Sequence, residues 1–88
     1  MKRRAILQTM DTKAYSTWLE VDLGAIRNNI KQISAMTGTR VMAIIKANGY
    51  GHGVLAVAEA ATEAGATWLG VARIEEALNL RAAGIVSE

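Results

Sequence analysis

A lysine followed by a glycine-rich loop is the part of this sequence best suited to chemistry. The stretch reads AIIKANGYGHG, residues 43–53, and Lys46 ends its apolar run. If that run is a buried strand, its carboxyl end lies where ligands bind in α/β proteins. Burial there lowers the pKa of a lysine, and a neutral amine can attack a carbonyl group to form a Schiff base. The alternative is a lysine at a strand end whose ammonium group simply reaches water.

The glycines after this lysine allow a second kind of contact. Gly49, Gly51 and Gly53 tolerate positive φ angles and let a ligand approach the backbone closely. The helix expected next would present free N–H groups at its start, which suit an anion such as phosphate. However, the lysine precedes the glycines, unlike in a Walker loop, and the spacing G-x-G-x-G differs from G-x-G-x-x-G. Spacing alone therefore leaves the phosphate site open.

Three polar side chains of the loop have different expected roles. Tyr50 is poorly placed for core packing, so its hydroxyl could reach a ligand, or its ring could lie on neighbouring apolar surface. His52 is the only histidine, and without a cysteine or a second histidine it does not indicate a metal site. We expect it to cap or brace the following helix rather than to catalyse. Asn48 is expected to stabilise the turn through its side chain.

Two further pairs of residues are expected to be structural. Trp18 and Trp68 are interpreted as core or interface packing rather than as stacking surfaces for a cofactor. Glu75 and Glu76 are interpreted as acidic residues at a helix start, where they favour the helix dipole. They are not interpreted as an acid/base dyad, because adjacent residues of a helix do not face each other.

The elements before the lysine are a short strand and a helix. The alternating pattern TWLEVDL predicts a strand over 17–23. Asp22 can cap the helix that follows, expected at 23–36 and ended by Gly38. Apolar residues spaced three and four apart give this helix one apolar face.

From residue 40 onward the pattern predicts alternating strands and helices. We expect a strand at 41–46, covered on both faces, then a helix at 52–64, a strand at 67–72 and a helix from 75 to Gly84. A third parallel strand is expected to begin at 85–86. This order indicates βαβ units and a parallel sheet. So few strands leave unpaired edges, and we therefore interpret the chain as truncated.

Composition and charge narrow the function classes. The 88 residues allow one small domain, and 51% are apolar. There is no cysteine, which excludes disulfides and thiolate metal sites and fits a cytoplasmic protein. Residues 1–16 are expected to be a disordered basic extension, and residues 17–88 to form the folded part. The basic residues are few and lack interleaved aromatics, and no apolar run is long enough to span a membrane, so neither nucleic acid nor a membrane is expected as a partner.

The lysine stretch closely resembles the cofactor-lysine motif of bacterial alanine racemases, which are fold-type III pyridoxal-phosphate enzymes. The resemblance includes WLEVDLGAIRNNI before the motif and GATWLGVARIEEALNLRAAGI after it, and extends over about residues 17–85. It implies the start of a TIM-type (β/α)8 barrel, with the strand at 41–46 as its first strand. The short strand and helix before it would belong to, or border, a second, β-rich domain. The chain would then be an N-terminal fragment.

The resemblance also implies a site and a reaction. Lys46 would hold pyridoxal 5'-phosphate as an internal aldimine and act as the acid/base group on the D-alanine face, and Tyr50 would help bind the cofactor phosphate. The family interconverts L-alanine and D-alanine by two-base proton transfer, supplies D-alanine for peptidoglycan, and works as a homodimer. Its second base is a tyrosine of the partner subunit's C-terminal domain, which lies outside residues 1–88. We therefore expect this chain to be inactive by itself.

Two other functions remain open. One is a different racemase or an amino-acid decarboxylase of the same barrel family, since the residues that separate substrates would lie beyond position 88. The other is a non-catalytic module that binds the cofactor or completes its open sheet with another chain.

Overall fold

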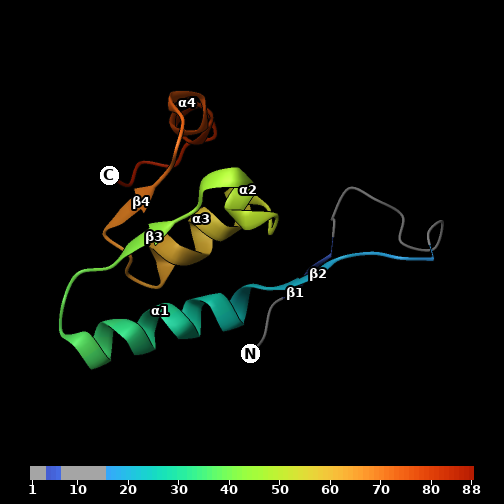
Figure 1. Cartoon of the computed structure of the whole chain (residues 1–88). Coiled ribbons are helices and arrows are strands. Elements are labelled where there is room, and N and C mark those ends of the chain that lie inside the picture. Colours follow the sequence, from blue (N-terminus) through green and yellow to red (C-terminus); the bar gives the residue numbers. More distant parts are fainter. Residues whose placement is uncertain (1–3, 7–15) are drawn as a thin grey trace.

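The computed structural model describes residues 4–6 and 16–88, arranged as an α/β body with an extended arm (Figure 1). Two two-stranded sheets are present in these residues, one antiparallel and one parallel. No helix in this part of the chain has the length and apolar character needed to cross a membrane. The elements, in chain order, are β1 (Arg4–Ile6), β2 (Glu20–Asp22), α1 (Leu23–Thr37), β3 (Met42–Ile44), α2 (Lys46–Tyr50), α3 (Val54–Glu63), β4 (Trp68–Gly70) and α4 (Ile74–Ala82).

Helix α1 has the expected ends because both caps are formed. The carboxylate of Asp22 accepts a hydrogen bond from the backbone N–H of Ala25 at 3.0 Å. At the other end Gly38 has a φ of 65°, and its N–H donates to the carbonyl of Ser34 at 2.9 Å. The apolar face contributes Leu23 and Ile30 to the core. The predicted range of 23–36 is thus confirmed to within one residue.

The parallel pair β3–β4 is the part of the fold that positions the lysine. Met42 lies opposite Trp68, and Ile44 lies opposite Gly70. Helix α3 connects the two strands, which is the expected βαβ arrangement. Alanines let α3 approach its neighbours closely, since Ala58 has no exposed surface. The core beside the sheet contains Ile45, Val57, Ala58 and Leu80.

The other face of this sheet is open, contrary to the prediction that the strand at 41–46 is covered on both faces. Met42 is 52% exposed and Ile44 is 48% exposed. The side chain of Ile44 leans over Gly70, where an added Cβ would lie 2.5 Å from its Cδ1. The prediction was wrong for the described chain because the buried clusters that involve this sheet gather Ala43 and Ile45, which alternate with the exposed pair.

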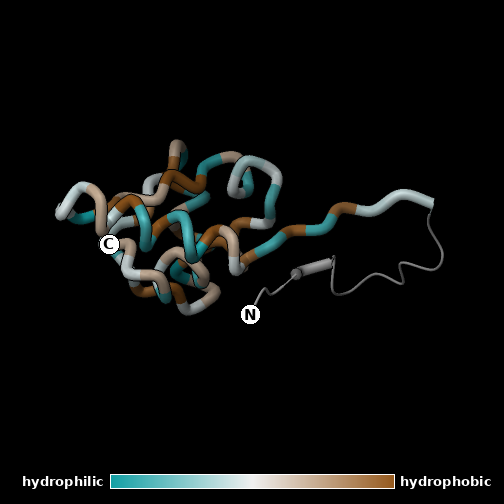
Figure 2. Tube along the Cα trace, turned by 90° about the horizontal axis from the view of Figure 1, so that it is seen from below, coloured by the Kyte–Doolittle hydropathy of each residue, from teal (hydrophilic) through white to brown (hydrophobic). Residues whose placement is uncertain are grey.

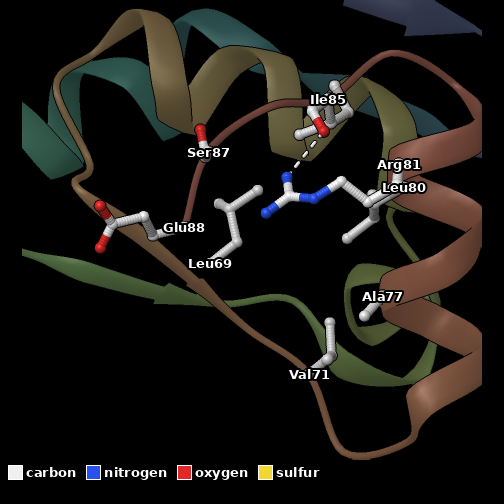
Figure 3. Close-up of a pocket in the computed structure, with 8 residues that line it drawn as sticks. All are labelled: Leu69, Val71, Ala77, Leu80, Arg81, Ile85, Ser87 and Glu88. Carbon is white, nitrogen blue, oxygen red and sulfur yellow. Dashed lines mark hydrogen bonds between the residues drawn. The ribbon is translucent and has the colours of Figure 1, made fainter.

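The expected third strand at 85–86 is also not formed. Residues 85–88 run beside β4 but make one backbone hydrogen bond to it, from the N–H of Leu69 to the carbonyl of Glu88 at 2.7 Å. Figure 3 shows this segment closing a small cavity between β4 and α4, where Arg81 donates to the carbonyl of Ile85 at 2.8 Å. A single backbone hydrogen bond does not form a β-ladder, so residues 85–88 are an irregular segment and not a strand.

The arm carries β1 and β2, which pair in antiparallel fashion (Figure 1). Figure 2 shows hydrophilic and hydrophobic residues alternating along β2 and the segment before it. Within the predicted disordered extension at 1–16, the structure describes β1 and Ser16, and β1 pairs with the edge of β2. Residues 1–3 and 7–15 lie outside the described part. Trp18 is 51% exposed, so it is not core packing within the described residues.

Candidate functional site

Lys46 directly follows Ile45, a buried residue just after β3. Ile45 is 1% exposed, and its N–H donates to the carbonyl of Gly70 at 2.8 Å, which ties the end of β3 to the end of β4. Lys46 itself is exposed, and no described residue accepts a hydrogen bond from its side chain. Of the two alternatives for this lysine, a buried amine or one that reaches water, the described chain shows the second, because none of its residues covers Lys46. The amine is therefore open to a ligand.

The turn after Lys46 is left-handed. In α2 the φ and ψ angles are 52° and 51° at Ala47, 57° and 41° at Asn48, and 63° and 39° at Gly49. Tyr50 and Gly51 continue with φ angles of 57° and 86°. Left-handed backbone costs a residue with a side chain roughly 1–2 kcal/mol. The positive φ angles expected at the glycines are confirmed, but those at Ala47 and Tyr50 were not predicted.

Contacts around Gly49 hold this turn in place. Its N–H donates to the carbonyl of Ile45 at 2.8 Å, and the residue is buried against Val57. The Oδ1 of Asn48 accepts a hydrogen bond from the N–H of Val54 at 2.9 Å. The Nδ1 of His52 lies 3.0 Å from the carbonyl oxygen of Gly49, at hydrogen-bonding distance. The predicted role of Asn48 in stabilising the turn is therefore confirmed. His52 was expected to cap or brace the following helix, but its hydrogen-bonding contact is to Gly49 in the turn itself.

The hydrogen bond between Asn48 and Val54 also removes one donor from the expected anion site at the start of α3. The first N–H of that helix, at Val54, is already bonded to the amide oxygen of Asn48. The side chain therefore occupies the position that an anion would take at that N–H. The prediction that the start of α3 presents free N–H groups was wrong at this position.

Glu76, in the first turn of α4, links the ends of the two strands. Its Oε2 accepts a hydrogen bond from the N–H of Ala47 at 2.8 Å. Its Oε1 accepts from the N–H groups of Ala72 at 2.9 Å and Arg73 at 2.8 Å. The hydrogen bonds from Ala72, Arg73 and Ala47 lower the pKa of this carboxyl from its ordinary value of 4.5.

The sequence indicated only part of this role. Glu76 does lie at a helix start, and its bond to the N–H of Arg73, three residues earlier, is the glutamate half of a capping box. That spacing is readable from sequence. The bond to Ala47 joins residues 29 positions apart, and no local pattern signals it. Its neighbour Glu75 points elsewhere and pairs with the side chain of Arg73 at 3.4 Å.

Tyr50 lies at the edge of a recess in the described chain. It is 59% exposed. It borders a recess of about 370 Å³ together with His52 and apolar residues of α1, β3 and α3, and Lys46 is not among the lining residues. Tyr50 and Lys46 therefore do not both line this recess.

Three further observations concern the rest of the described chain. The smaller cavity between β4 and α4, about 70 Å³, contains none of the predicted site residues (Figure 3). Residues 4–6 and 16–88 also hold no group of three or more histidine, cysteine, aspartate or glutamate side chains placed to bind a metal ion. Trp68 packs under Arg40, whose guanidinium carbon is 4.4 Å from the ring centroid.

Comparison with known proteins gives one consistent result. A family model described as "Alanine racemase, N-terminal domain" matches residues 21–88. The alanine racemase of Symbiobacterium thermophilum is 57% identical over 70 residues, which is 78% of this chain and 19% of that protein. The alanine racemase of Methanococcus maripaludis is 51% identical over 74 residues, 82% of this chain and 20% of that protein. The chain thus spans about a fifth of the length of these relatives.

Solved structures of alanine racemases also superpose on this chain. The crystal structure of alanine racemase from D-cycloserine producing Streptomyces lavendulae has a TM-score of 0.72 and 52% identity, covering 74% of this chain and 17% of that one. The alanine racemase from Bacillus anthracis with bound L-Ala-P has a TM-score of 0.70 and 46% identity, covering 74% and 17%. The α/β body with its parallel strands therefore aligns with the N-terminal domain of these proteins. The chain belongs to the alanine racemase family.

Proposed function

We propose that this chain provides the cofactor lysine of an alanine racemase that interconverts L-alanine and D-alanine, with Lys46 in that role. The observation that carries the proposal is the exposed amine of Lys46, placed at the carboxyl end of an anchored parallel strand and followed by a strained left-handed turn. Ligands of α/β proteins bind at this end of the strands. Strained backbone that neighbouring contacts maintain is typical of functional sites.

The amine of Lys46 and the hydroxyl of Tyr50 are groups that suit pyridoxal 5'-phosphate. Its aldehyde requires a primary amine that is not committed to an ion pair, and Lys46 meets this requirement among the described residues. When bound, pyridoxal phosphate delocalises the electron pair left behind when a proton leaves the α-carbon of an amino acid. Tyr50 is the proposed hydrogen-bond donor to the phosphate, and its exposed ring leaves the hydroxyl accessible.

The proposed work of Lys46 is to hold the cofactor and then to move a proton. Its amine would take the α-proton from D-alanine, or return one to the same face when the reaction runs the other way. A second group must serve the opposite face, and the resemblance to the family implies that this group comes from the C-terminal domain of the other subunit. We therefore propose a homodimeric complete protein, and no racemase activity for residues 1–88 alone.

The choice of alanine rests on the relatives. They carry the name alanine racemase at 57% and 51% identity, and the Bacillus anthracis structure contains L-Ala-P. A racemase of another amino acid, or a decarboxylase, remains the alternative for the complete protein. D-alanine made by this reaction would serve peptidoglycan synthesis.

The test is chemical trapping on the chain itself. The chain is incubated with pyridoxal phosphate, reduced with borohydride, digested and mapped by mass spectrometry. We expect the reduced adduct at Lys46 in clear excess over Lys2, Lys13 and Lys31. The variant Lys46→Arg keeps the charge and should lose the adduct. Adducts spread evenly over the four lysines would refute the assignment of Lys46.

A further inference from the structure

We propose that Glu76 is a positioning residue for Lys46: its carboxylate fixes the backbone on which the cofactor lysine is carried. This inference rests on the proposed function of Lys46 and adds a residue that does not touch the cofactor. Glu76 belongs to α4, whereas Lys46 belongs to the turn after β3. A hydrogen bond joins these two elements, from the N–H of Ala47 to Oε2 of Glu76 at 2.8 Å.

This hydrogen bond acts on Lys46 through a rigid unit. The peptide group between Lys46 and Ala47 is planar, so it moves together with the Cα of Lys46. Holding the N–H of Ala47 therefore fixes the ψ angle of Lys46, and with it the direction in which the side chain leaves the strand. On the other side of Lys46, Ile45 is held by the carbonyl of Gly70 at 2.8 Å. The lysine lies between two anchors, and both come from the β4–α4 part of the chain.

The two carboxylate oxygens of Glu76 accept hydrogen bonds from different parts of the chain. Oε1 serves the start of α4 through Ala72 and Arg73, which is the ordinary capping role. Oε2 is not needed for capping and instead reaches Ala47, whose φ of 52° is costly for a residue with a Cβ. A charged acceptor makes a stronger hydrogen bond than a neutral one, which suits a contact that must hold strained backbone.

The test uses the difference between a carboxylate and an amide. Glu76→Gln keeps one acceptor oxygen but replaces the other with an NH₂ group, which cannot accept from an N–H. Glu76→Asp keeps the charge and can still bond near the start of α4, but its side chain is one methylene shorter and should not reach Ala47. Glu75→Gln is the matched control, because that side chain pairs with Arg73, whereas the hydrogen bond from Ala47 goes to Glu76.

Two readouts are measured on the full chain. The first is the exchange rate of the Ala47 amide hydrogen, and the second is the fraction of reduced pyridoxal-phosphate adduct that maps to Lys46. We expect Glu76→Gln and Glu76→Asp to speed exchange at Ala47 about tenfold and to reduce the share of adduct at Lys46 several-fold. Glu75→Gln should leave both at the wild-type values.

The outcomes separate the two proposals. Unchanged exchange and unchanged adduct share in the folded Glu76 variants would overturn the positioning role. An Ala47 amide that exchanges freely in the wild-type chain would overturn it without any variant, so a variant that fails to fold does not decide the matter. If the wild-type adduct is scattered over the lysines, the proposed function of Lys46 fails, whatever the exchange at Ala47 shows.

Discussion

The two junctions at the carboxyl ends of the parallel strands have very different backbones. After β3, five consecutive residues from Ala47 to Gly51 have positive φ angles. After β4, no residue before α4 does, and Arg73 is extended with φ −128° and ψ 147°. Strain is thus concentrated at the junction that carries Lys46. The helix that follows the unstrained junction carries Glu76, whose carboxylate accepts the hydrogen bond from Ala47 in the strained junction.

The largest effect on stability is expected from Asn48→Ala at the strained junction. Asparagine tolerates left-handed backbone better than alanine, and its side chain bonds the first N–H of α3. Loss of this backbone tolerance and of this hydrogen bond should together lower the free energy of unfolding by about 2 kcal/mol, read from the urea midpoint. Asn79→Ala in α4 is the matched control and should change it by less than about 0.5 kcal/mol. Equal midpoints for the two variants would contradict the comparison.

A pair of alanine-to-glycine substitutions should give opposite signs at the two junctions. Both Ala47 and Ala72 donate their N–H to Glu76, but only Ala47 has a positive φ. Ala47→Gly relieves left-handed strain and should raise stability by up to about 1 kcal/mol. Ala72→Gly relieves nothing and should lower it by about 0.5–1 kcal/mol, because the unfolded chain gains freedom. Thermal unfolding of the two variants makes the measurement, and the same sign for both would show that Ala47 is not strained.

Acid should weaken both junctions together, because they share Glu76. Its pKa is lowered in the folded chain by hydrogen bonds from Ala72, Arg73 and Ala47, with a smaller contribution from the Arg73 charge. A lowered pKa means that the stabilisation is fully present above the ordinary value of 4.5 and is lost as the pH falls through the folded value. The effect should be the smallest of the three, since the group is near solvent.

The pH dependence is measured as the urea midpoint at neutral pH and again well below pH 4.5. Glu76→Gln should flatten this dependence. Glu75 also has a lowered pKa, through its own backbone hydrogen bond and then the Arg73 side chain, so Glu75→Gln should flatten it too. An unchanged acid profile in Glu76→Gln would contradict the bonds assigned to that carboxylate.

Sequence patterns predicted the features that depend on residues close together in the chain, such as helix caps and turns. Asp22 and Gly38 bound α1 because capping depends on residues within one turn, and the apolar run before Lys46 predicted the parallel pair. The family followed from residues 17–85, and the comparisons confirm it. Asn48 was correctly interpreted as a turn residue.

What sequence could not predict depends on contacts between distant residues. The left-handed angles of Ala47 and Tyr50 run against their intrinsic preference and are imposed by the surrounding structure. The bond from Ala47 to Glu76 depends on how α4 packs beside the end of β3. The open face at Met42 reflects which elements are present to cover it, which residue patterns do not encode.

The most direct test of the proposed role of Lys46 compares trapping in the folded and the unfolded chain. Pyridoxal phosphate and borohydride are applied in native buffer and again in concentrated urea, and the share of adduct at Lys46 is mapped in each. We expect Lys46 to take most of the adduct in native buffer and to lose this preference in urea, because the fold presents its amine. The same distribution over the lysines in both conditions would show that the β3 junction does not create a cofactor site.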